Sequence, residues 1–254
     1  MSVAISMRNV SLQMHNTIHL QRIDLELDFG ETVVVAGDVG SGKSLLLRMV
    51  LGLPGIQRED EVRLGGEVVV DGKSVFGLSS GGLRDLRRRI GLVKSDGGLI
   101  ENMDVRQNIT LPLTYHSSKM GAEFISERYE AILAALDCTE FSESRLRPVA
   151  LNRVQQVYVS LARALIVDPV ILLADDPTRG LGVQATEGIT RHLFSSEMQL
   201  TRLIATTRLT PYLDRANRFF LLEDGQVVPL GDTGELMKCD HPWIRAELSR
   251  GNWD

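Results

Sequence analysis

The chain is most informative where it reads Gly37-Asp38-Val39-Gly40-Ser41-Gly42-Lys43-Ser44, which matches the phosphate-binding loop pattern G-x-x-G-x-G-K-S. An apolar run at 32–36 precedes this loop, and a run typical of a helix follows it at 45–50. A strand, a glycine-rich loop and a helix in that order are the setting in which the pattern has physical meaning. We therefore predict an α/β fold with a P-loop NTPase core.

Each residue type in this loop has a chemical reason to be there. Glycines let the backbone curl so that successive N–H groups point toward a polyphosphate. Lys43 has the reach to contact the terminal phosphates, and the Ser44 hydroxyl is a ligand for the Mg²⁺ that accompanies a nucleotide. The helix start adds a partial positive charge. The loop therefore predicts binding of ATP and Mg²⁺ by residues 37–44; a glycine-rich turn before a helix is the alternative interpretation.

Composition limits the other possibilities. The 254 residues are 43% hydrophobic and carry a formal net charge of −5, which argues against nucleic acid as a partner. No apolar run approaches the roughly 20 residues that a membrane-spanning helix needs, and no signal peptide is evident. Cys138 and Cys239 lie far apart, without His or Cys neighbours at metal-ligand spacing. We expect a cytosolic, reduced protein whose only metal is the Mg²⁺ of the nucleotide.

Two kinds of hydrophobic pattern predict two kinds of strand. Within residues 18–29, positions 23–29 alternate between apolar and acidic side chains, which indicates a half-buried strand. Residues 3–12 and 67–72 are predicted to be strands of the same antiparallel layer. Short continuous apolar runs favour central parallel strands covered on both faces, and they occur at 33–36, 170–174 and 203–206. Residues 219–228 predict a hairpin with a glycine turn.

Helices are expected to fill the middle of the chain. Residues 125–137 and 152–166 each place apolar side chains on one helical face. We predict a single domain over 1–254, with a helical lobe inserted at about 78–166 and a short C-terminal extension at about 232–254. The basic run at 84–89 is expected to be a solvated helix face.

Downstream motifs point to a family. The apolar run 170–174 ends in Asp175-Asp176-Pro177-Thr178, and Leu161-Ala162-Arg163-Ala164-Leu165 comes shortly before it. With the phosphate loop, this order resembles the ATPase subunits of ABC (ATP-binding cassette) transporters over essentially the whole chain. The resemblance implies ATP held between two cassettes, homodimeric or heterodimeric, and an integral membrane transporter subunit as a further partner. It also implies a peripheral location at the cytoplasmic face of the inner (plasma) membrane.

The resemblance assigns roles to three further residues. Asp175 corresponds to the family's Mg²⁺-binding carboxylate and is intact. Asp176 stands where the family usually has the Glu that orients the attacking water, and one methylene less withdraws the carboxylate by about 1.5 Å, enough to slow catalysis. Arg208 replaces the family's switch His: arginine can hold a phosphate, but it cannot shuttle a proton. We take Asp176 and Arg208 as the candidate catalytic residues.

The remaining family motifs are altered as well. The signature motif, usually L-S-G-G-Q, reads Leu-Asn-Arg-Val-Gln at 151–155, where side chains stand at the family's glycine positions. The D-loop at 179–182 lacks the family's Asp, and Lys94 or Ser95 stands in place of the Gln of the Gln-loop. The aromatic residue that stacks on adenine should lie near Met14 and His15; His15 is the candidate, with an exposed loop histidine as the alternative.

Binding groups are thus retained while hydrolysis groups are not. We predict a subunit that binds Mg-ATP and hydrolyses it slowly or not at all by itself. An active ATPase that uses Asp176 and Arg208, and an ATP-gated regulatory protein without a transport role, are the alternatives; a P-loop kinase fits less well. Residues 102–113 and the tail at 234–248 look like the corresponding stretches of MCE/Mla-type lipid-transport ATPases, which implies a lipid cargo. Similar stretches occur in lipoprotein-release and cell-division cassettes, which are the alternatives.

Overall fold

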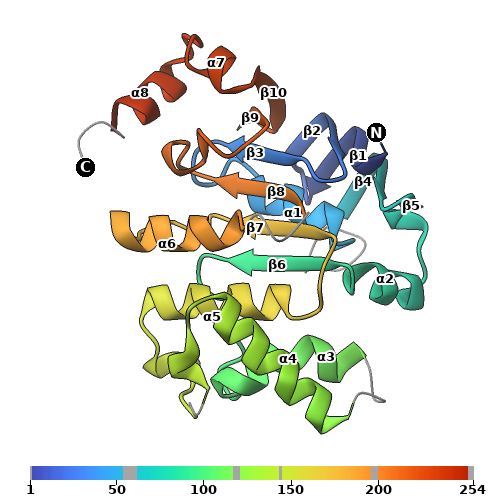
Figure 1. The fold of residues 1–254 in the computed structure, drawn as a ribbon. Coiled ribbons are helices and arrows are strands. Elements are labelled where there is room, and N and C mark those ends of the chain that lie inside the picture. The colour runs from blue at the N-terminus through green and yellow to red at the C-terminus, as the bar shows by residue number, and fades with distance from the viewer. Residues whose placement is uncertain (1, 54–61, 117–120, 143–144, 196–199, 251–254) are drawn as a thin grey trace. The chain divides into compact units, whose positions relative to one another are not determined.

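A computed structural model describes residues 2–53, 62–116, 121–142, 145–195 and 200–250, and Figure 1 traces them. They fall into two compact units, Met1–Arg87 with Gln199–Asp254, and Arg88–Met198. The first unit contains the phosphate loop and the C-terminal segment, and the second contains most of the predicted helices. The single-domain organisation with a lobe at 78–166 stays a prediction, and the last residues of the expected C-terminal extension, 251–254, lie outside the described part.

An antiparallel sheet with the order β2-β1-β4-β5 forms one layer of the first unit. Its strands are β1 Val3–Met14, β2 Thr17–Asp28, β4 Val62–Val70 and β5 Lys73–Ser74. Along β2 the apolar residues Ile23, Leu25 and Leu27 are buried, while Asp24 and Glu26 between them are exposed. The predicted half-buried strand and antiparallel layer are therefore confirmed.

The first unit also holds the strand that leads into the phosphate loop. Strand β3 Thr32–Ala36 lies parallel to both of its neighbours, β8 Thr201–Thr206 and β9 Arg218–Glu223. Every residue of β3 and β8 is buried, as expected for strands covered on both faces. Helix α1 Lys43–Val50 lies against β8, and β10 Gln226–Gly231 completes the predicted hairpin with β9.

The second unit combines two parallel strands with helices. Strand β6 Ile90–Lys94 pairs with β7 Ile171–Asp175, and α5 Arg153–Leu165 packs on β6. The predicted helix at 125–137 is α4 Ala122–Ala135, which buries Tyr129, Ile132 and Leu133. The other elements of this unit are α3 Val105–His116, α6 Val183–Leu193, η3 Thr139–Phe141 and η4 Pro148–Ala150.

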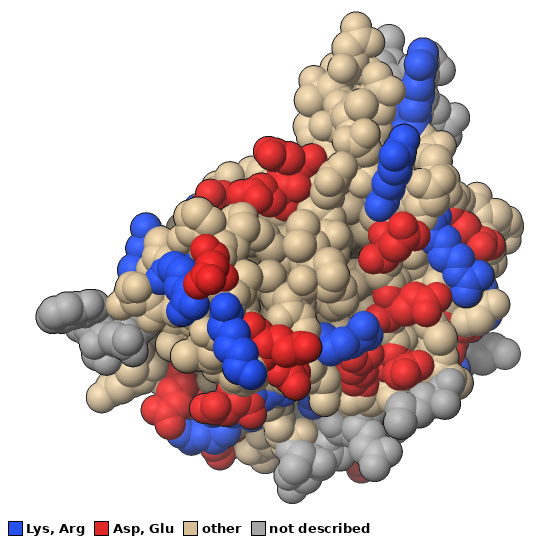
Figure 2. All heavy atoms as spheres, turned by 90° about the horizontal axis from the view of Figure 1, so that it is seen from above, with Lys and Arg blue, Asp and Glu red and all other residues tan. Residues whose placement is uncertain are grey.

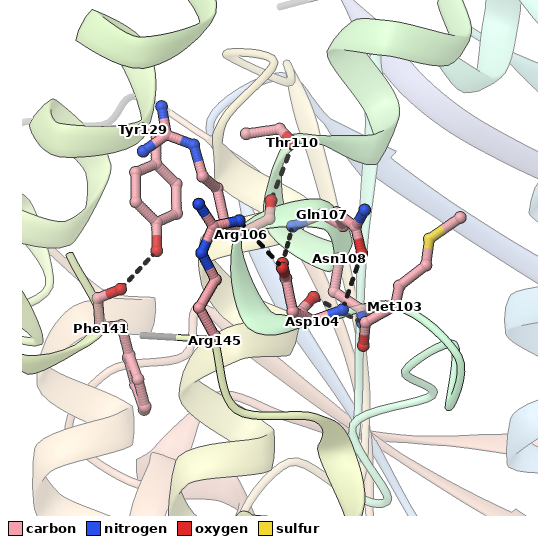
Figure 3. A network of polar contacts seen from close by, with 9 residues as sticks. All are labelled: Met103, Asp104, Arg106, Gln107, Asn108, Thr110, Tyr129, Phe141 and Arg145. Atoms are coloured by element: carbon pink, nitrogen blue, oxygen red, sulfur yellow. Dashed lines mark hydrogen bonds and ion pairs between the residues drawn. The ribbon is translucent and has the colours of Figure 1, made fainter. Parts of the chain in front are cut away.

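A polar network fixes the start of α3 (Figure 3). Asp104 and Gln107 exchange backbone and side-chain hydrogen bonds of 2.8 and 3.0 Å, which is a capping box. The fully buried Asn108 amide donates to the carbonyls of Ile100, Met103 and Asp104, each at 3.1 Å. A buried amide that satisfies its partners in this way specifies one conformation of the turn before α3.

Arg106 joins α3 to α4 in the same network. Its guanidinium lies 4.5 Å from the centre of the Tyr129 ring and donates to Ser126 at 2.9 Å. The Tyr129 hydroxyl in turn donates to Phe141 O at 2.7 Å. Burial raises the pKa of Tyr129 to about 12, so the phenol keeps the proton it donates. These polar contacts connect α3, α4 and Phe141 within the second unit.

Shorter elements complete the first unit. They are η2 Val75–Gly77, α2 Ser80–Arg87, η5 Thr210–Tyr212, α7 Thr233–Leu236 and α8 Pro242–Arg250. In the basic run at 84–89, Arg84, Arg88 and Arg89 are exposed, whereas Arg87 donates to Leu51 O at 2.9 Å. The expected solvated helix face is thus confirmed only in part: Arg84 is exposed on α2, Arg87 is bonded to the end of α1, and Arg88 and Arg89 are exposed in the turn after the helix.

Charges of both signs are interspersed on the face drawn in Figure 2, where no broad area is basic alone. That nucleic acid is not a partner stays a prediction, which rests on the net charge of −5. Within the described residues, none of the helices has both the length and the apolar character that crossing a bilayer demands.

Candidate functional site

The phosphate loop has the backbone that its glycines predict. Gly37, Gly40 and Gly42 have φ values of 154°, 89° and 105°, in a region that side chains disfavour. At Gly37 a Cβ atom would lie 2.4 Å from Leu222 O, so only glycine fits between this loop and β9. The loop curvature is therefore specified by residue type, as the sequence predicts.

Lys43 lies over the loop from the first turn of α1. Its side chain is buried, with 7% of the residue exposed, and its ammonium donates to Gly37 O at 2.8 Å and Asp38 O at 2.6 Å. A further contact to Ser41 Oγ is 3.4 Å. Burying an ammonium is costly unless it is hydrogen-bonded, and these carbonyls supply its partners. The cation is thus held at the centre of the loop.

These residues fit a polyphosphate. Gly42 precedes α1 without a side-chain cap, and Ser44 is exposed in the first turn of that helix. The donors present are an ammonium, a hydroxyl and backbone N–H groups at a helix start, the set that an anionic phosphate chain requires. Among the described residues no group of three or more His, Cys, Asp or Glu is placed to hold a metal ion.

A cavity of about 600 Å³ flanks the loop in the first unit. Residues from four segments line it: 17–19 at the start of β2, 38–41 of the loop, 221–225 of the hairpin, and Trp243 of α8. The predicted adenine contact, His15, is exposed in the turn between β1 and β2 with φ 53°, and it is not among the residues that line this cavity. Its assignment stays a prediction.

Arg208 follows β8 in the same unit. In the β3–β8 ladder Ala36 pairs with Thr206, so the phosphate loop and the segment carrying Arg208 leave the sheet at the same edge. The Arg208 backbone is tied to Thr206, whose hydroxyl accepts from Arg208 N and donates to Arg208 O, both at 3.0 Å. The pairing of β3 with β8 therefore places the segment with Arg208 at the end of β3 from which the phosphate loop begins.

Asp175 and Asp176 lie in the second unit, at the end of β7. Asp175 is the last residue of the strand, and its carbonyl accepts from Ser95 N at 3.0 Å. Asp176 is buried, with 6% exposed, and has φ 50°, in the left-handed region. Lys94 pairs with Asp175 in the β6–β7 ladder, so the predicted Mg²⁺ carboxylate and the Gln-loop positions come together at one edge.

Residues 151–155, the predicted signature segment, include the capped start of α5. Asn152 caps α5 by accepting from Gln155 N at 3.0 Å, and the Gln155 side chain returns a bond to Asn152 N. Arg153 Nε donates to Arg179 O of the D-loop at 3.1 Å. Asn152 is therefore a side-chain cap of α5, and one donor of the Arg153 guanidinium is directed to its own chain.

Arg163 orders the turn after the Gln-loop positions. Its guanidinium donates to Gly97 O at 2.8 Å and Gly98 O at 2.9 Å. Burial lowers the pKa of Arg163 from its ordinary value, although arginine stays charged at any pH in question. Lys94 is one of the two residues predicted to replace the Gln of the Gln-loop. Its ammonium forms an ion pair with Asp96, with 3.3 Å between Lys94 Nζ and Asp96 Oδ2.

Sequence reasoning missed the contribution of α8 to the cavity. Trp243 Nε1 donates to Asp38 Oδ1 at 2.8 Å, and the two residues lie 205 positions apart. The sequence around either residue does not predict this contact, because a tryptophan occurs in many short amphipathic helices that pack on a protein surface.

Comparison with known proteins gives one family. The model of the ABC transporter family matches residues 20–179. The methionine import ATP-binding protein MetN of Clostridioides difficile is 30% identical over 236 residues, 91% of this chain and 70% of that protein. MetN of Clostridium acetobutylicum is 31% identical, with the same coverage of both chains.

Solved structures agree with this. The dimeric post-hydrolysis state of the ATP-binding cassette MJ0796, bound to ADP and Pi, has a TM-score of 0.77 at 28% identity and covers 88% of this chain and 96% of its own. The cbiO1 protein of Clostridium perfringens, part of the transporter complex cbiONQ, has a TM-score of 0.79 at 22% identity over 98% of this chain and 94% of its own, a likeness of fold alone. The predicted fold class is thereby confirmed, and the chain belongs to the ABC transporter family, as one of its ATP-binding domains.

Proposed function

We propose that this chain binds Mg-ATP through residues 37–44 and serves as the ATP-binding subunit of a membrane transporter. The observation that carries the proposal is the buried Lys43 ammonium at the centre of a loop whose glycines adopt positive φ. The cavity of about 600 Å³ beside that loop is within the size range of small-molecule sites. Ser44 and Asp175 are the residues that would supply oxygen ligands to Mg²⁺.

We further propose that hydrolysis by this chain alone is slow. Asp176 has a carboxylate one methylene shorter than the family's Glu, and misplacement of a catalytic group by about 1 Å can cost on the order of 100-fold in rate. Arg208 lacks the proton-transfer ability of a histidine. Arg153 places a side chain where the family presents bare backbone to the partner cassette's nucleotide.

An active ATPase is the alternative to the proposal of slow hydrolysis. Asp176 is buried next to the strand end that carries Asp175, which is the position a general base requires. A carboxylate held there with Arg208 as the phosphate-binding cation would catalyse hydrolysis in an unfamiliar arrangement. Turnover by the purified chain decides between the two.

The partners we propose are a second cassette and an integral membrane subunit, with the chain at the cytoplasmic face of the inner membrane. MJ0796 is described as a dimeric cassette, and the MetN relatives are described as import ATP-binding proteins, which supports both partners. Residues 109–113, which belong to α3 of the second unit, correspond by family resemblance to the stretch that forms the groove for a membrane subunit. An ATP-gated regulator would lack that membrane partner.

Two cargoes are candidates. The relatives named above are methionine import proteins, so a methionine-like solute is the cargo that similarity favours. A lipid cargo was predicted from residues 102–113 and 234–248, and none of those relatives supports it. Uptake of labelled methionine, beside lipid transfer, in vesicles carrying the complete transporter would separate the two.

The test of ATP binding and hydrolysis uses the full chain and two variants. We expect the wild type to bind Mg-ATP with slow turnover, Lys43→Ala to lose binding, and Asp176→Glu to raise turnover about tenfold or more. Calorimetry gives the affinity, and phosphate release gives the rate.

Each result has a distinct meaning. Steady wild-type turnover that Lys43→Ala abolishes would overturn the proposal of slow hydrolysis and favour Asp176 and Arg208 as working catalysts. Absence of Mg-ATP binding by the wild type would overturn the main proposal.

A further inference from the structure

Helix α8 is joined to the phosphate loop by one side chain. Trp243, the second residue of the helix, is half-buried and donates its indole N–H to Asp38 Oδ1 at 2.8 Å. Asp38 is the second residue of the loop, and its own carbonyl accepts from the Lys43 ammonium. A residue near the C-terminal end of the described chain thus contacts the same loop position as the central cation.

The indole also lines the cavity beside the loop. Among the described residues that line it, the aromatic side chains are Trp243 and His19. The remaining lining is formed by the loop, by aliphatic Ile18, Leu221 and Leu222, and by acidic Glu223 and Asp224 of the hairpin. An indole offers a broad apolar face together with one N–H donor, and here that donor is already directed to Asp38.

The rest of α8 is fixed by buried contacts within the first unit. Ile244 is fully buried, and Glu247 is 5% exposed. Glu247 Oε1 accepts from Leu209 N at 3.3 Å, next in sequence to Arg208. Just before the helix, His241 Nε2 lies 3.1 Å from Glu223 Oε2 of the hairpin. Trp243 is therefore held in place from both sides rather than by its own bond alone.

We propose that Trp243 is a nucleotide-contacting residue whose indole forms the wall of the cavity against the nucleobase. This rests on the proposed binding of Mg-ATP by residues 37–44. A phosphate chain held by Lys43 leaves the base to the adjoining cavity, because the loop supplies donors for phosphates and no flat surface. An aromatic face stabilises any nucleobase by stacking, so Trp243 contributes far more affinity for the base than for the phosphates.

The bond to Asp38 gives the indole a second effect. A carboxylate in a phosphate-binding loop opposes an anionic ligand, unless it is oriented away from that ligand. The Trp243 N–H directs the Asp38 carboxylate toward α8. The helix thereby acts on the base through the ring and on the loop through the hydrogen bond.

The experiment compares a ligand that has a base with one that has none. Affinities for Mg-ATP and for magnesium tripolyphosphate are measured by calorimetry on the full chain. We expect Trp243→Ala to weaken Mg-ATP about tenfold or more. Its affinity for tripolyphosphate should stay within about threefold of the wild type. Trp243→Phe keeps a ring and should recover most of the Mg-ATP affinity.

Two matched variants complete the design. Lys43→Ala should weaken both ligands, because it removes the phosphate contact. Arg245→Ala alters the exposed face of the same helix, outside the cavity lining, and should leave both affinities within about twofold.

A second measurement leaves Trp243 unaltered. In the Trp253→Phe variant, Trp243 is the sole tryptophan of the chain. Its fluorescence should change saturably with Mg-ATP, at the affinity that calorimetry gives for the same variant.

The results that would overturn the role of Trp243 differ from those that would overturn the proposed binding of Mg-ATP. Wild-type binding of Mg-ATP with no loss in Trp243→Ala, or with an equal loss for tripolyphosphate, would overturn the role of Trp243 and leave ATP binding intact. Unchanged fluorescence of Trp243 at saturating Mg-ATP would do the same. Failure of the wild type to bind Mg-ATP would instead overturn the function on which the inference rests.

Discussion

Asp176 combines burial with a backbone conformation that few residues tolerate. Its φ of 50° lies in the left-handed region, where aspartate is more common than bulky residues, and only 6% of it is exposed. Such positions cost of order 1–3 kcal/mol and persist where the surroundings determine them. The carboxylate is thus rigidly presented at the end of β7, so the missing methylene of a Glu cannot be compensated by backbone movement without breaking local contacts.

His192 is a residue whose titration should affect folding. Burial lowers its pKa below the usual 6.5, with Asp137 opposing the shift and Arg191 adding to it. Its ring meets Tyr158 edge-on, with centroids 5.7 Å apart. The folded state therefore favours the neutral imidazole, whereas the unfolded chain takes up a proton near pH 6.5.

The sign of the pH dependence follows from this difference. Stabilisation by His192 is present above about pH 6.5 and is lost as the pH falls toward the lower folded pKa. We expect the free energy of unfolding to fall less between about pH 7 and pH 5 in His192→Phe, which keeps a ring beside Tyr158, than in the wild type. Urea unfolding at both pH values measures this; equal slopes in the two proteins would contradict it.

At the scale of elements, the sequence predicted most of the fold because the signals were local. Alternation along β2, continuous apolar runs at β3, β7 and β8, and the glycine turn between β9 and β10 each act over a few residues. The phosphate loop was equally predictable, since its glycines are required by positive φ. The contact between Trp243 and Asp38 was not, because it joins residues 205 positions apart through packing alone.

The degenerate signature provides a prediction about a single helix. Asn152 forms a capping box with Gln155 at the start of α5. Replacing such a cap by alanine costs about 1 kcal/mol, because a backbone donor of the first turn loses its acceptor. We expect Asn152→Ala to lower the free energy of unfolding by about that amount, and Asn152→Ser, which keeps an acceptor, to lower it by less than half as much. Urea unfolding of the full chain measures both; equal losses would show that the cap is not responsible.

At the scale of the whole molecule, the proposed function places ATP between two cassettes. The phosphate loop lies in one compact unit, while the carboxylates after β7 and the altered signature lie in the other. Sequence could not predict how strongly two such chains associate, because an interface depends on side chains whose partners lie on another molecule.

Nucleotide should therefore control assembly. We expect Mg-ATP to increase the dimeric fraction of the purified chain, since a ligand that binds the dimer more tightly than the monomer shifts the equilibrium. Lys43→Ala should stay at the nucleotide-free level. Light scattering after size-exclusion chromatography at several protein concentrations measures this. A dimer fraction independent of nucleotide would contradict the model of ATP held between two cassettes.

The distance along the chain between Trp243 and Asp38 has a consequence for biosynthesis. The two side chains meet although 205 positions separate them. At translation rates of about 5–20 residues per second, the ribosome adds the tryptophan roughly 10–40 s after the aspartate. During that interval the nascent chain lacks the indole wall, and for most of it the chain also lacks β8 and β9, which flank β3. Capture of nucleotide would thus be postponed until synthesis has passed α8, so an unfinished subunit would be slow to dimerise around ATP.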